Sequence, residues 1–294
     1  MSVMISLVGE QPAPNVLPVR YFAPDQVALV CTDRTLKQAK QTAKMIGDKI
    51  VRPFCETEAY RLELIRAKLE RYITDHGWVK TDLLFNLTGG TKTMVIAALE
   101  IARRLNVQTF YYQTEDNQSL IHPYRFCEGN LICETPISVE ATLTIDEFLR
   151  LYIARYKLGD FKNDFERKVA EVLMTLGPGY EFLPNAILTG VGPNVEVDGV
   201  LRHGNTFAVI EAKLHAKKSE GIDQLRSVTD QRTLGTYTKR FLISADELHS
   251  NDQELAAAYR ITVVVLPSGR HDAEMFSNED AQRLIKAIRK EMEP

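Results

Sequence analysis

The sequence predicts an α/β protein built from two units of similar size. Short apolar runs alternate with amphipathic stretches through the first half of the chain, which is typical of parallel strands joined by helices. The second half changes to a helix, three successive strands, a helix and a strand, followed by a further helix, strand and helix. With 294 residues, the chain can bury two hydrophobic cores of ordinary domain size.

The first unit is predicted to span residues 1–143. Its apolar runs indicate strands at residues 4–8, 26–32, 49–55, 82–87 and 108–113. The amphipathic segments between them indicate helices at residues 35–48, 59–76 and 92–105. A hairpin at residues 119–137, with Glu128, Gly129 and Asn130 at its turn, completes the unit. Strand–helix alternation of this kind favours a parallel sheet with helices on both faces.

A helix at residues 144–156 begins with a Thr or Asp cap, and we interpret residues 144–159 as a connecting helix. The second unit is then predicted at residues 160–294. The sequence at 203–205, His-Gly-Asn, provides a tight turn between two of its strands. Helices are expected at residues 160–176, 221–234, 252–259 and 278–291, and strands at residues 180–188, 195–202, 206–214, 240–244 and 261–266.

Composition restricts the classes of function. The 36 basic residues face 39 acidic ones, so any nucleic acid must be held by local patches and not by the net charge of −3. The longest apolar run is too short to cross a membrane, and the N-terminus lacks a secretion signal. The four Cys form no C-x-x-C pair. A reduced, cytoplasmic protein without a membrane partner is therefore expected.

A glycine-rich corner follows the predicted strand at residues 82–87. The residues Asn86-Leu87-Thr88-Gly89-Gly90-Thr91-Lys92 lie where that strand ends and a helix begins. Two glycines let the backbone approach a phosphate, and the helix offers free N–H groups and the positive end of its dipole. The loop lacks the upstream Gly of a Walker A motif, which argues against ATP hydrolysis. A plain turn capped by Thr explains a bare Gly pair, but the Asn, two Thr and Lys at the same corner favour phosphate binding.

The pattern N-x-T-G-G-T-K after the fourth strand resembles the signature of CARF domains, the Rossmann-like sensors of CRISPR systems. The first loop, from Gly9 to Val16, and Cys31-Thr32-Asp33 after the second strand agree with this resemblance. It implies a homodimer that binds a cyclic oligoadenylate, most commonly cyclic tetra-adenylate, whose even symmetry suits a two-fold axis. The ligand-binding residues that it implies are Gln11, Thr32, Asn86, Thr88, Gly89, Gly90, Thr91 and Lys92.

Acidic residues gather on two successive strands of the second half. Glu196 and Asp198 share one face of a predicted strand, and Glu211 and Lys213 share one face of the next. Asp198 and Glu211 make a hard-oxygen site suited to Mg²⁺ or Mn²⁺, and Lys213 is placed to stabilise developing charge. A solvated hairpin with an ordinary E-x-K ion pair explains the tripeptide alone. The acidic helix before the strands and the α-β-β-β-α-β order favour the metal site.

This second half resembles the PD-(D/E)xK, restriction-endonuclease-like nucleases, with Asp198, Glu211 and Lys213 at the core motif. Val197 stands where the family has the Pro of the Pro–Asp pair, so the match departs from the motif there. We expect Glu166, on the preceding helix, to add a third metal ligand or to hold a metal-bound water. Gln224, on the following helix, is expected to position the strand backbone or Lys213 within the catalytic site.

Sensor first and nuclease second is the order of the CARF-fused effector nucleases of type III CRISPR systems. The combined resemblance implies an endonuclease dependent on Mg²⁺ or Mn²⁺ and activated by cyclic tetra-adenylate. RNA, single-stranded DNA and duplex DNA all remain open as substrates. Two alternatives also remain open: a sensor whose second unit binds nucleic acid without cleaving it, and a ring nuclease that degrades the cyclic ligand at the first site.

Overall fold

The computed structural model describes residues 1–78, 82–140, 142–153, 155–189, 195–214, 218–230, 233–235, 237–271 and 273–294. The chain divides into two compact units, Met1–Thr142 and Leu143–Pro294. Across the described ranges, every helix is too short or too polar to cross a lipid bilayer. Each unit has its own sheet and its own hydrophobic core.

One sheet of eight strands forms the centre of the described part of the first unit, in the order β3-β2-β1-β4-β5-β6-β7, with β8 paired to β6. Among the described residues, five strands run parallel, in the sheet order β3, β2, β1, β4 and β5. Strands β6, β7 and β8 add antiparallel pairs at one edge. Their bounds are β1 (Ser2–Leu7), β2 (Gln26–Cys31), β3 (Cys55–Glu56), β4 (Asp82–Asn86), β5 (Gln108–Glu115), β6 (Gln118–Cys127), β7 (Asn130–Cys133) and β8 (Ile137–Ser138).

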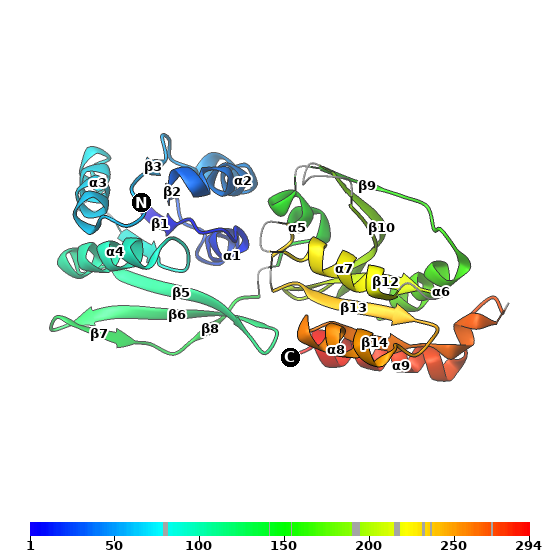
Figure 1. Cartoon of the computed structure of the whole chain (residues 1–294). Coiled ribbons are helices and arrows are strands. Elements are labelled where there is room, and N and C mark those ends of the chain that lie inside the picture. Colours follow the sequence, from blue (N-terminus) through cyan, green and yellow to red (C-terminus); the bar gives the residue numbers. More distant parts are fainter. Residues whose placement is uncertain are drawn as a thin grey trace. The chain divides into compact units, whose positions relative to one another are not determined.

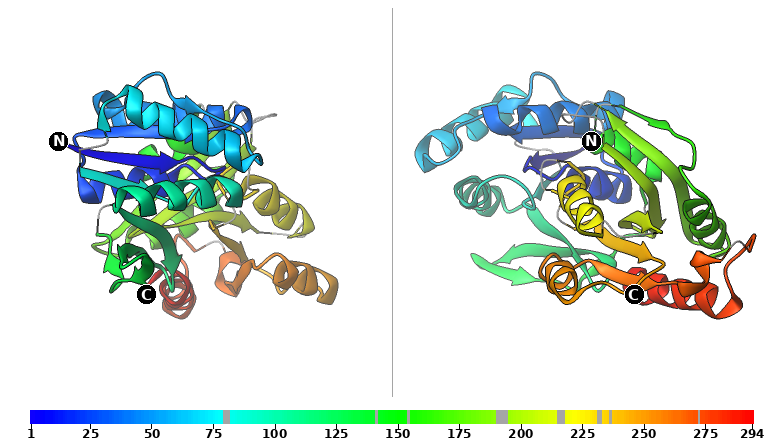
Figure 2. Two further views of the ribbon diagram at one scale, coloured as in Figure 1. Left: turned by 90° about the vertical axis from the view of Figure 1, so that its left-hand side faces the viewer. Right: turned by 45° about the vertical axis from the view of Figure 1, so that its right-hand side comes forward.

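Four helices cover the two faces of the parallel strands: α1 (Ala13–Phe22), α2 (Leu36–Ile46), α3 (Leu62–Asp75) and α4 (Lys92–Leu105). Figure 1 shows α3 and α4 on one side of these strands and α1 and α2 on the other. The left view of Figure 2 looks at the unit from the side of α3 and α4. Ile65 and Leu69 of α3 and Met94 and Ile101 of α4 pack on the apolar strands in one buried cluster. This arrangement confirms the predicted Rossmann-like sheet.

Two elements of the first unit differ from the prediction. Helix α1, between β1 and β2, was not predicted, because Pro14 and Pro18 interrupt its helical pattern. Pro is tolerated in the first turn, where the backbone N–H has no helical partner, and Pro14 occupies that turn. Strand β3 is two residues long, and the expected strand at residues 49–55 contains the cis Arg52–Pro53 peptide bond.

The second unit contains a mixed sheet of six strands in the order β14-β13-β12-β11-β10-β9. Its strands β9 to β12 are antiparallel, whereas β12, β13 and β14 run parallel. The bounds are β9 (Arg155–Leu158), β10 (Tyr180–Thr189), β11 (Val195–His203), β12 (Thr206–Lys213), β13 (Lys239–Ser244) and β14 (Thr262–Val265). The predicted α-β-β-β-α-β order is present as α6 (Asp164–Met174), β10, β11, β12, α7 (Lys218–Val228) and β13.

Side chains of α6 and α9 (Asn278–Met292) fill one face of this sheet. Phe165 and Leu173 of α6 pack with Leu284 and Ile288 of α9 in one buried cluster. Helix α7 contacts β12 and β13 and also packs against α8 (Ser250–Ala258). The right view of Figure 2 shows α7 in yellow and α6 in green on opposite sides of the sheet. The helix predicted at residues 221–234 ends earlier, at Val228, and its residues 231–232 lie outside the described residues.

The predicted connecting helix belongs to the second unit. Helix α5 (Ile145–Tyr152) is shorter than expected, and residue 154 lies outside the described residues. Thr144 caps α5 by accepting a hydrogen bond from the backbone N–H of Glu147. Phe148 stacks on Phe207 of β12, with 3.8 Å between ring centroids. Segment 144–159 therefore contributes a packed helix and the edge strand β9 to the second unit.

Candidate functional site

The glycine-rich corner of the first unit is a close backbone contact between the loops that follow β1 and β4. These strands are parallel neighbours, so both loops leave the same edge of the sheet. A methyl group added to Gly89 would lie 2.2 Å from the Leu7 carbonyl oxygen and 2.5 Å from the Gly9 nitrogen. Gly90 has a φ of +75°, a conformation that favours glycine. Both glycines are thus required for the path of the backbone.

The corner continues into the first turn of α4. Thr91 caps this helix, and its hydroxyl accepts a hydrogen bond from the Met94 backbone N–H and also donates one to the Ala59 carbonyl. Lys92, the first residue of α4, is exposed. The positive end of a 14-residue helix and an exposed ammonium group therefore lie at the same point. This arrangement suits an anionic group such as a phosphate.

Asn86 and Thr88 hold the corner together and do not present free polar groups. The Asn86 side chain is fully buried, and its amide nitrogen donates to Ser6 Oγ and to the Pro14 carbonyl. Its Oδ1 accepts hydrogen bonds from the backbone N–H and the hydroxyl of Thr88. The Thr88 hydroxyl in turn accepts from the Tyr112 N–H. All four hydrogen-bonding positions of the Asn86 amide are therefore used within the protein, so this side chain shapes the corner and has no free position for a ligand.

The two other predicted ligand residues follow β1 and β2. Gln11 is half-buried in the loop between β1 and α1. Thr32 is buried, and its backbone N–H donates to the Thr35 hydroxyl at the start of a short 3₁₀ turn. A groove of about 600 Å³ opens beside these loops, past the ends of β2 and β3. Its lining residues, apart from Leu64 and Lys68 of α3, lie at the end of β3 or follow β2 and β3: Asp33, Arg34, Glu56, Thr57, Glu58, Ala59 and Tyr60.

In the second unit, Asp198 of β11 and Glu211 of β12 lie on neighbouring strands. The β11–β12 ladder ends at the pair Gly199–Ile210, so the next step of the same register places Asp198 opposite Glu211. Asp198 is 8% exposed and Glu211 is 1% exposed. Asp198 Oδ2 accepts a hydrogen bond of 2.7 Å from the Ala212 N–H. Glu211 Oε2 is buried and lacks a hydrogen-bond partner.

Burial changes the acidity of both carboxyl groups. It raises the pKa of Asp198 to about 6, with a further contribution from the negative charge of Glu166. It also raises the pKa of Glu211 to about 8, and the negative charge of Asp198 adds to this shift. Two buried carboxylates with one unpartnered oxygen are a donor set that fits a hard divalent cation.

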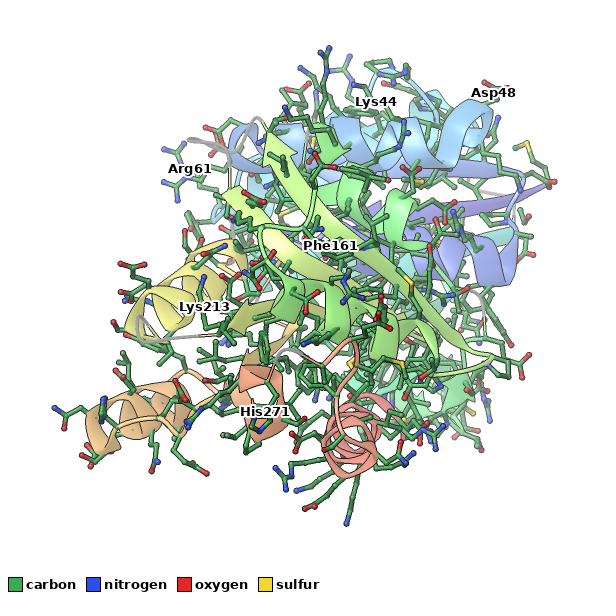
Figure 3. All side chains as sticks on the ribbon, turned by 90° about the vertical axis from the view of Figure 1, so that its right-hand side faces the viewer. Lys44, Asp48, Arg61, Phe161, Lys213 and His271 are labelled. Carbon is green, nitrogen blue, oxygen red and sulfur yellow. The ribbon has the colours of Figure 1, made fainter. Side chains whose placement is uncertain are left out.

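Lys213 completes this group. Its Nζ lies 2.5 Å from Glu211 Oε1. Burial acts to lower the pKa of Lys213, but the negative charge of Glu211, the hydrogen bond that Lys213 donates to Glu211 and the negative charge of Asp198 together outweigh burial. The pKa of Lys213 is therefore raised, and the ammonium group stays charged. A methyl group at Gly221 of α7 would lie only 3.3 Å from Lys213 Cε, so α7 packs directly on this side chain. Figure 3 shows Lys213 beside the ribbon of α7.

Glu166 lies in the first turn of α6, and its role as a third metal ligand stays a prediction. Its Oε2 accepts from the Lys162 backbone N–H and its Oε1 accepts from Asn163 Nδ2, and both bonds fasten the first turn of α6. Within the described ranges, there is no group of three or more His, Cys, Asp or Glu residues placed to hold a metal ion. Glu166 thus acts on Asp198 through its charge and stabilises the start of its own helix.

Gln224 positions the strand, which was one of its two expected roles. Its side-chain amide donates a hydrogen bond from α7 to the Glu196 carbonyl of β11. Lys162, whose Nζ lies 3.0 Å from Glu196 Oε2, was not predicted as a site residue. The positive charge of Lys162 acts on both Asp198 and Glu211. Lys162 stands 34 positions before Glu196 in the sequence and only the fold brings them together, so no local motif could have indicated it.

Comparison with known proteins supports the fold of both units. Residues 3–147 match a family model described as the Card1 CARF domain. The predicted CARF resemblance of the first unit is thereby confirmed. A search of the curated proteins finds no match.

Three solved structures share the fold of the chain over almost its whole length. Can2 from Sulfobacillus thermosulfidooxidans, solved in complex with cyclic tetra-adenylate, is 16% identical with a TM-score of 0.74, and the match covers 100% of both chains. VC1899 from Vibrio cholerae is 11% identical with a TM-score of 0.74 over 98% of both chains. A type III CRISPR defence DNA nuclease activated by cyclic oligoadenylate is 15% identical with a TM-score of 0.60, over 97% of this chain and 51% of that one. At these identities the likeness concerns the fold, and the predicted two-unit α/β class is confirmed.

Proposed function

We propose that this chain is a CRISPR effector nuclease of the PD-(D/E)xK type, activated by cyclic tetra-adenylate and dependent on Mg²⁺ or Mn²⁺. It would act as a homodimer on phosphodiester bonds of RNA or DNA. One observation carries the proposal: the buried carboxyl groups of Asp198 and Glu211 lie on adjacent strands, and Glu211 pairs with Lys213, in a chain whose first unit matches a CARF domain.

The first unit supports recognition of a cyclic oligoadenylate. Gly89 and Gly90 bring backbone to the edge of the sheet, and the α4 N-terminus and Lys92 supply positive charge for phosphate groups. The groove beside Thr91 provides room of about 600 Å³ and contains Arg34 and Tyr60, which can pair with phosphate and stack on a base. The binding of cyclic tetra-adenylate by Can2 favours this ligand over other cyclic oligoadenylates.

The second unit supports hydrolysis of a phosphodiester. A divalent cation held by Asp198 and Glu211 would lower the pKa of bound water and polarise the phosphate. Lys213 keeps its positive charge beside Glu211 and is placed to stabilise the negative charge that develops in the reaction. Gln224 holds β11 through the Glu196 carbonyl and so keeps Asp198 in place. Lys162 adds positive charge beside the acidic cluster formed by Glu196, Asp198 and Glu211.

Activation requires that the ligand bind the active arrangement of the dimer more tightly than the resting one. The test is a cleavage assay with Mn²⁺ or Mg²⁺ on labelled RNA, single-stranded DNA and supercoiled plasmid, with and without cyclic tetra-adenylate. Glu211→Gln removes a metal ligand, and Glu254→Gln on the exposed side of α8 is the matched control.

We expect cleavage that depends on the ligand, that Glu211→Gln reduces at least 100-fold and that Glu254→Gln preserves. Ligand binding without cleavage of any substrate would contradict the nuclease and leave a sensor that only binds nucleic acid. Degradation of the cyclic ligand at the same rate in Glu211→Gln would instead indicate a ring nuclease at the first site.

A further inference from the structure

Asn185 has an unusual backbone conformation in the middle of β10. Its φ is +46°, in the left-handed region that Asn adopts more readily than most other non-glycine residues. Among the described residues, the other non-glycine residues with positive φ lie in turns or at helix ends, and Asn185 alone lies within a strand. A conformation of this kind persists where the surrounding structure enforces it, and such conformations are concentrated at functional sites.

The register places Asn185 beside the acidic cluster. Pro184 pairs with Gly199 and Ala186 pairs with Val197, so Asn185 stands opposite Asp198. Asp198 in turn stands opposite Glu211, one step beyond the last pair of β11 and β12. Asn185, Asp198 and Glu211 therefore form one row across three adjacent strands. With a strand spacing of about 4.8 Å, neighbouring members of the row are close enough to share one ligand.

The side chain of Asn185 is buried without its full set of partners. It is 2% exposed, and its Oδ1 lacks a hydrogen-bond partner. Glu211 Oε2, at the other end of the row, is also buried without a hydrogen-bond partner. Buried oxygen acceptors are nearly always satisfied in folded proteins, by protein groups, water or a bound ion. Each of these two oxygens, on either side of Asp198 in the row, has a position open for a hydrogen-bond donor or a cation.

We propose that Asn185 supplies the third side-chain oxygen of the divalent-cation site formed with Asp198 and Glu211. This inference rests on the proposed function. Both Glu166 oxygens already accept hydrogen bonds at the start of α6, whereas Asn185 Oδ1 lacks a hydrogen-bond partner. An amide oxygen is a hard donor suited to Mg²⁺ or Mn²⁺, and because it is neutral it adds no repulsion to the neighbouring carboxylates. The left-handed backbone is then the means by which β10 presents this amide to the row.

The test measures Mn²⁺ binding to the 294-residue chain by isothermal titration calorimetry, without substrate. Asn185→Gly removes the amide and fits the left-handed backbone, so the variant should fold as well as the wild type. We expect its Mn²⁺ affinity to fall at least tenfold. Asn185→Asp keeps an oxygen donor and should bind Mn²⁺ at least as tightly as the wild type. Asn106→Gly, at a left-handed helix end in the first unit, is the matched control and should leave the affinity unchanged.

Two outcomes separate this inference from the proposed function. If the wild type binds Mn²⁺ and Glu211→Gln abolishes binding while Asn185→Gly does not weaken it, the metal site stands and the role of Asn185 is wrong. If the wild type itself binds no Mn²⁺ at millimolar concentration, both proposals fail together. Loss of binding in Asn185→Asp would also overturn the inference, and this variant provides the answer if Asn185→Gly does not fold.

Discussion

Two carboxyl groups, those of Asp198 and Glu211, make the stability of the second unit depend on pH. The pKa values of Asp198 and Glu211 are raised by burial to about 6 and about 8, whereas the unfolded chain has values near 4. The folded protein therefore binds these protons more tightly than the unfolded chain does. The stability that this contributes is fully present below about pH 4 and is lost progressively as the pH rises through the folded values of about 6 and about 8.

Glu211→Gln should remove much of this dependence. In metal-free protein the free energy of unfolding of the second unit should fall between pH 5 and pH 9, and it should fall less in the variant. At pH 9 we expect Glu211→Gln to be more stable than the wild type by on the order of 3 kcal/mol, with little difference near pH 4. Urea unfolding with EDTA at several pH values measures this, and Glu254→Gln should follow the wild type. Parallel curves for Glu211→Gln and the wild type would contradict the raised pKa.

At the scale of elements, α5 is a structural part of the second unit and not a free connector. Phe148 is buried on Phe207 of β12, and the backbone N–H of Ile145 donates to Glu181 Oε2 on β10. The β9 strand that follows pairs with β10 from Arg155 to Leu158. Because β10 also contains Asn185, α5 and β9 support the strand that borders the acidic cluster.

Phe148→Ala tests this packing. Removal of a buried aromatic side chain that is stacked on another ring typically costs about 3 kcal/mol or more. We expect Phe148→Ala to lower the melting temperature of the second unit in scanning calorimetry. Phe161→Ala is the matched control, because the Phe161 ring is 39% exposed and its loss should cost less than about 1 kcal/mol. Equal effects of the two substitutions would mean that α5 is not held by Phe148.

At the scale of the whole molecule, the two proposed sites lie in separate compact units. The glycine-rich corner with Lys92 is in Met1–Thr142, and the row with Asp198 and Glu211 is in Leu143–Pro294. A ligand that binds only the folded form of one unit stabilises that unit in proportion to the logarithm of its concentration. Each ligand should therefore act first on the unfolding of the unit that contains its site.

Calorimetry with each ligand measures this. At 100 times its Kd, cyclic tetra-adenylate should stabilise the first unit by about 2.7 kcal/mol, and Mn²⁺ should stabilise the second unit. Lys92→Ala should weaken the effect of cyclic tetra-adenylate, equivalent to about a tenfold loss of affinity, and should leave the effect of Mn²⁺ unchanged. If Lys92→Ala retained the full stabilisation, the α4 N-terminus would not be the phosphate site.

The local pattern of the sequence determined most elements and both site motifs. Strand and helix periodicity placed α4 at Lys92–Leu105 and β10, β11 and β12 within a few residues of their observed bounds, because their apolar spacing is regular. It also identified Gly89, Gly90 and the group Asp198, Glu211 and Lys213, because residue type and alternation are local properties. Helix α1 and strand β9 were missed, since Pro18 interrupts the helical pattern and the edge strand is only four residues long.

Only the tertiary structure decided which of these side chains are free to act. Asn86 has the right chemistry for a ligand, but Ser6, Pro14 and Thr88 use every hydrogen-bonding position of its amide. Both Glu166 oxygens accept hydrogen bonds at the start of α6. Lys162 and Asn185 have no recognisable local motif, and strand pairing and loop packing bring them to the acidic cluster. The reason is physical: a sequence pattern specifies which groups a segment carries, whereas burial and hydrogen-bond partners depend on segments distant in the chain.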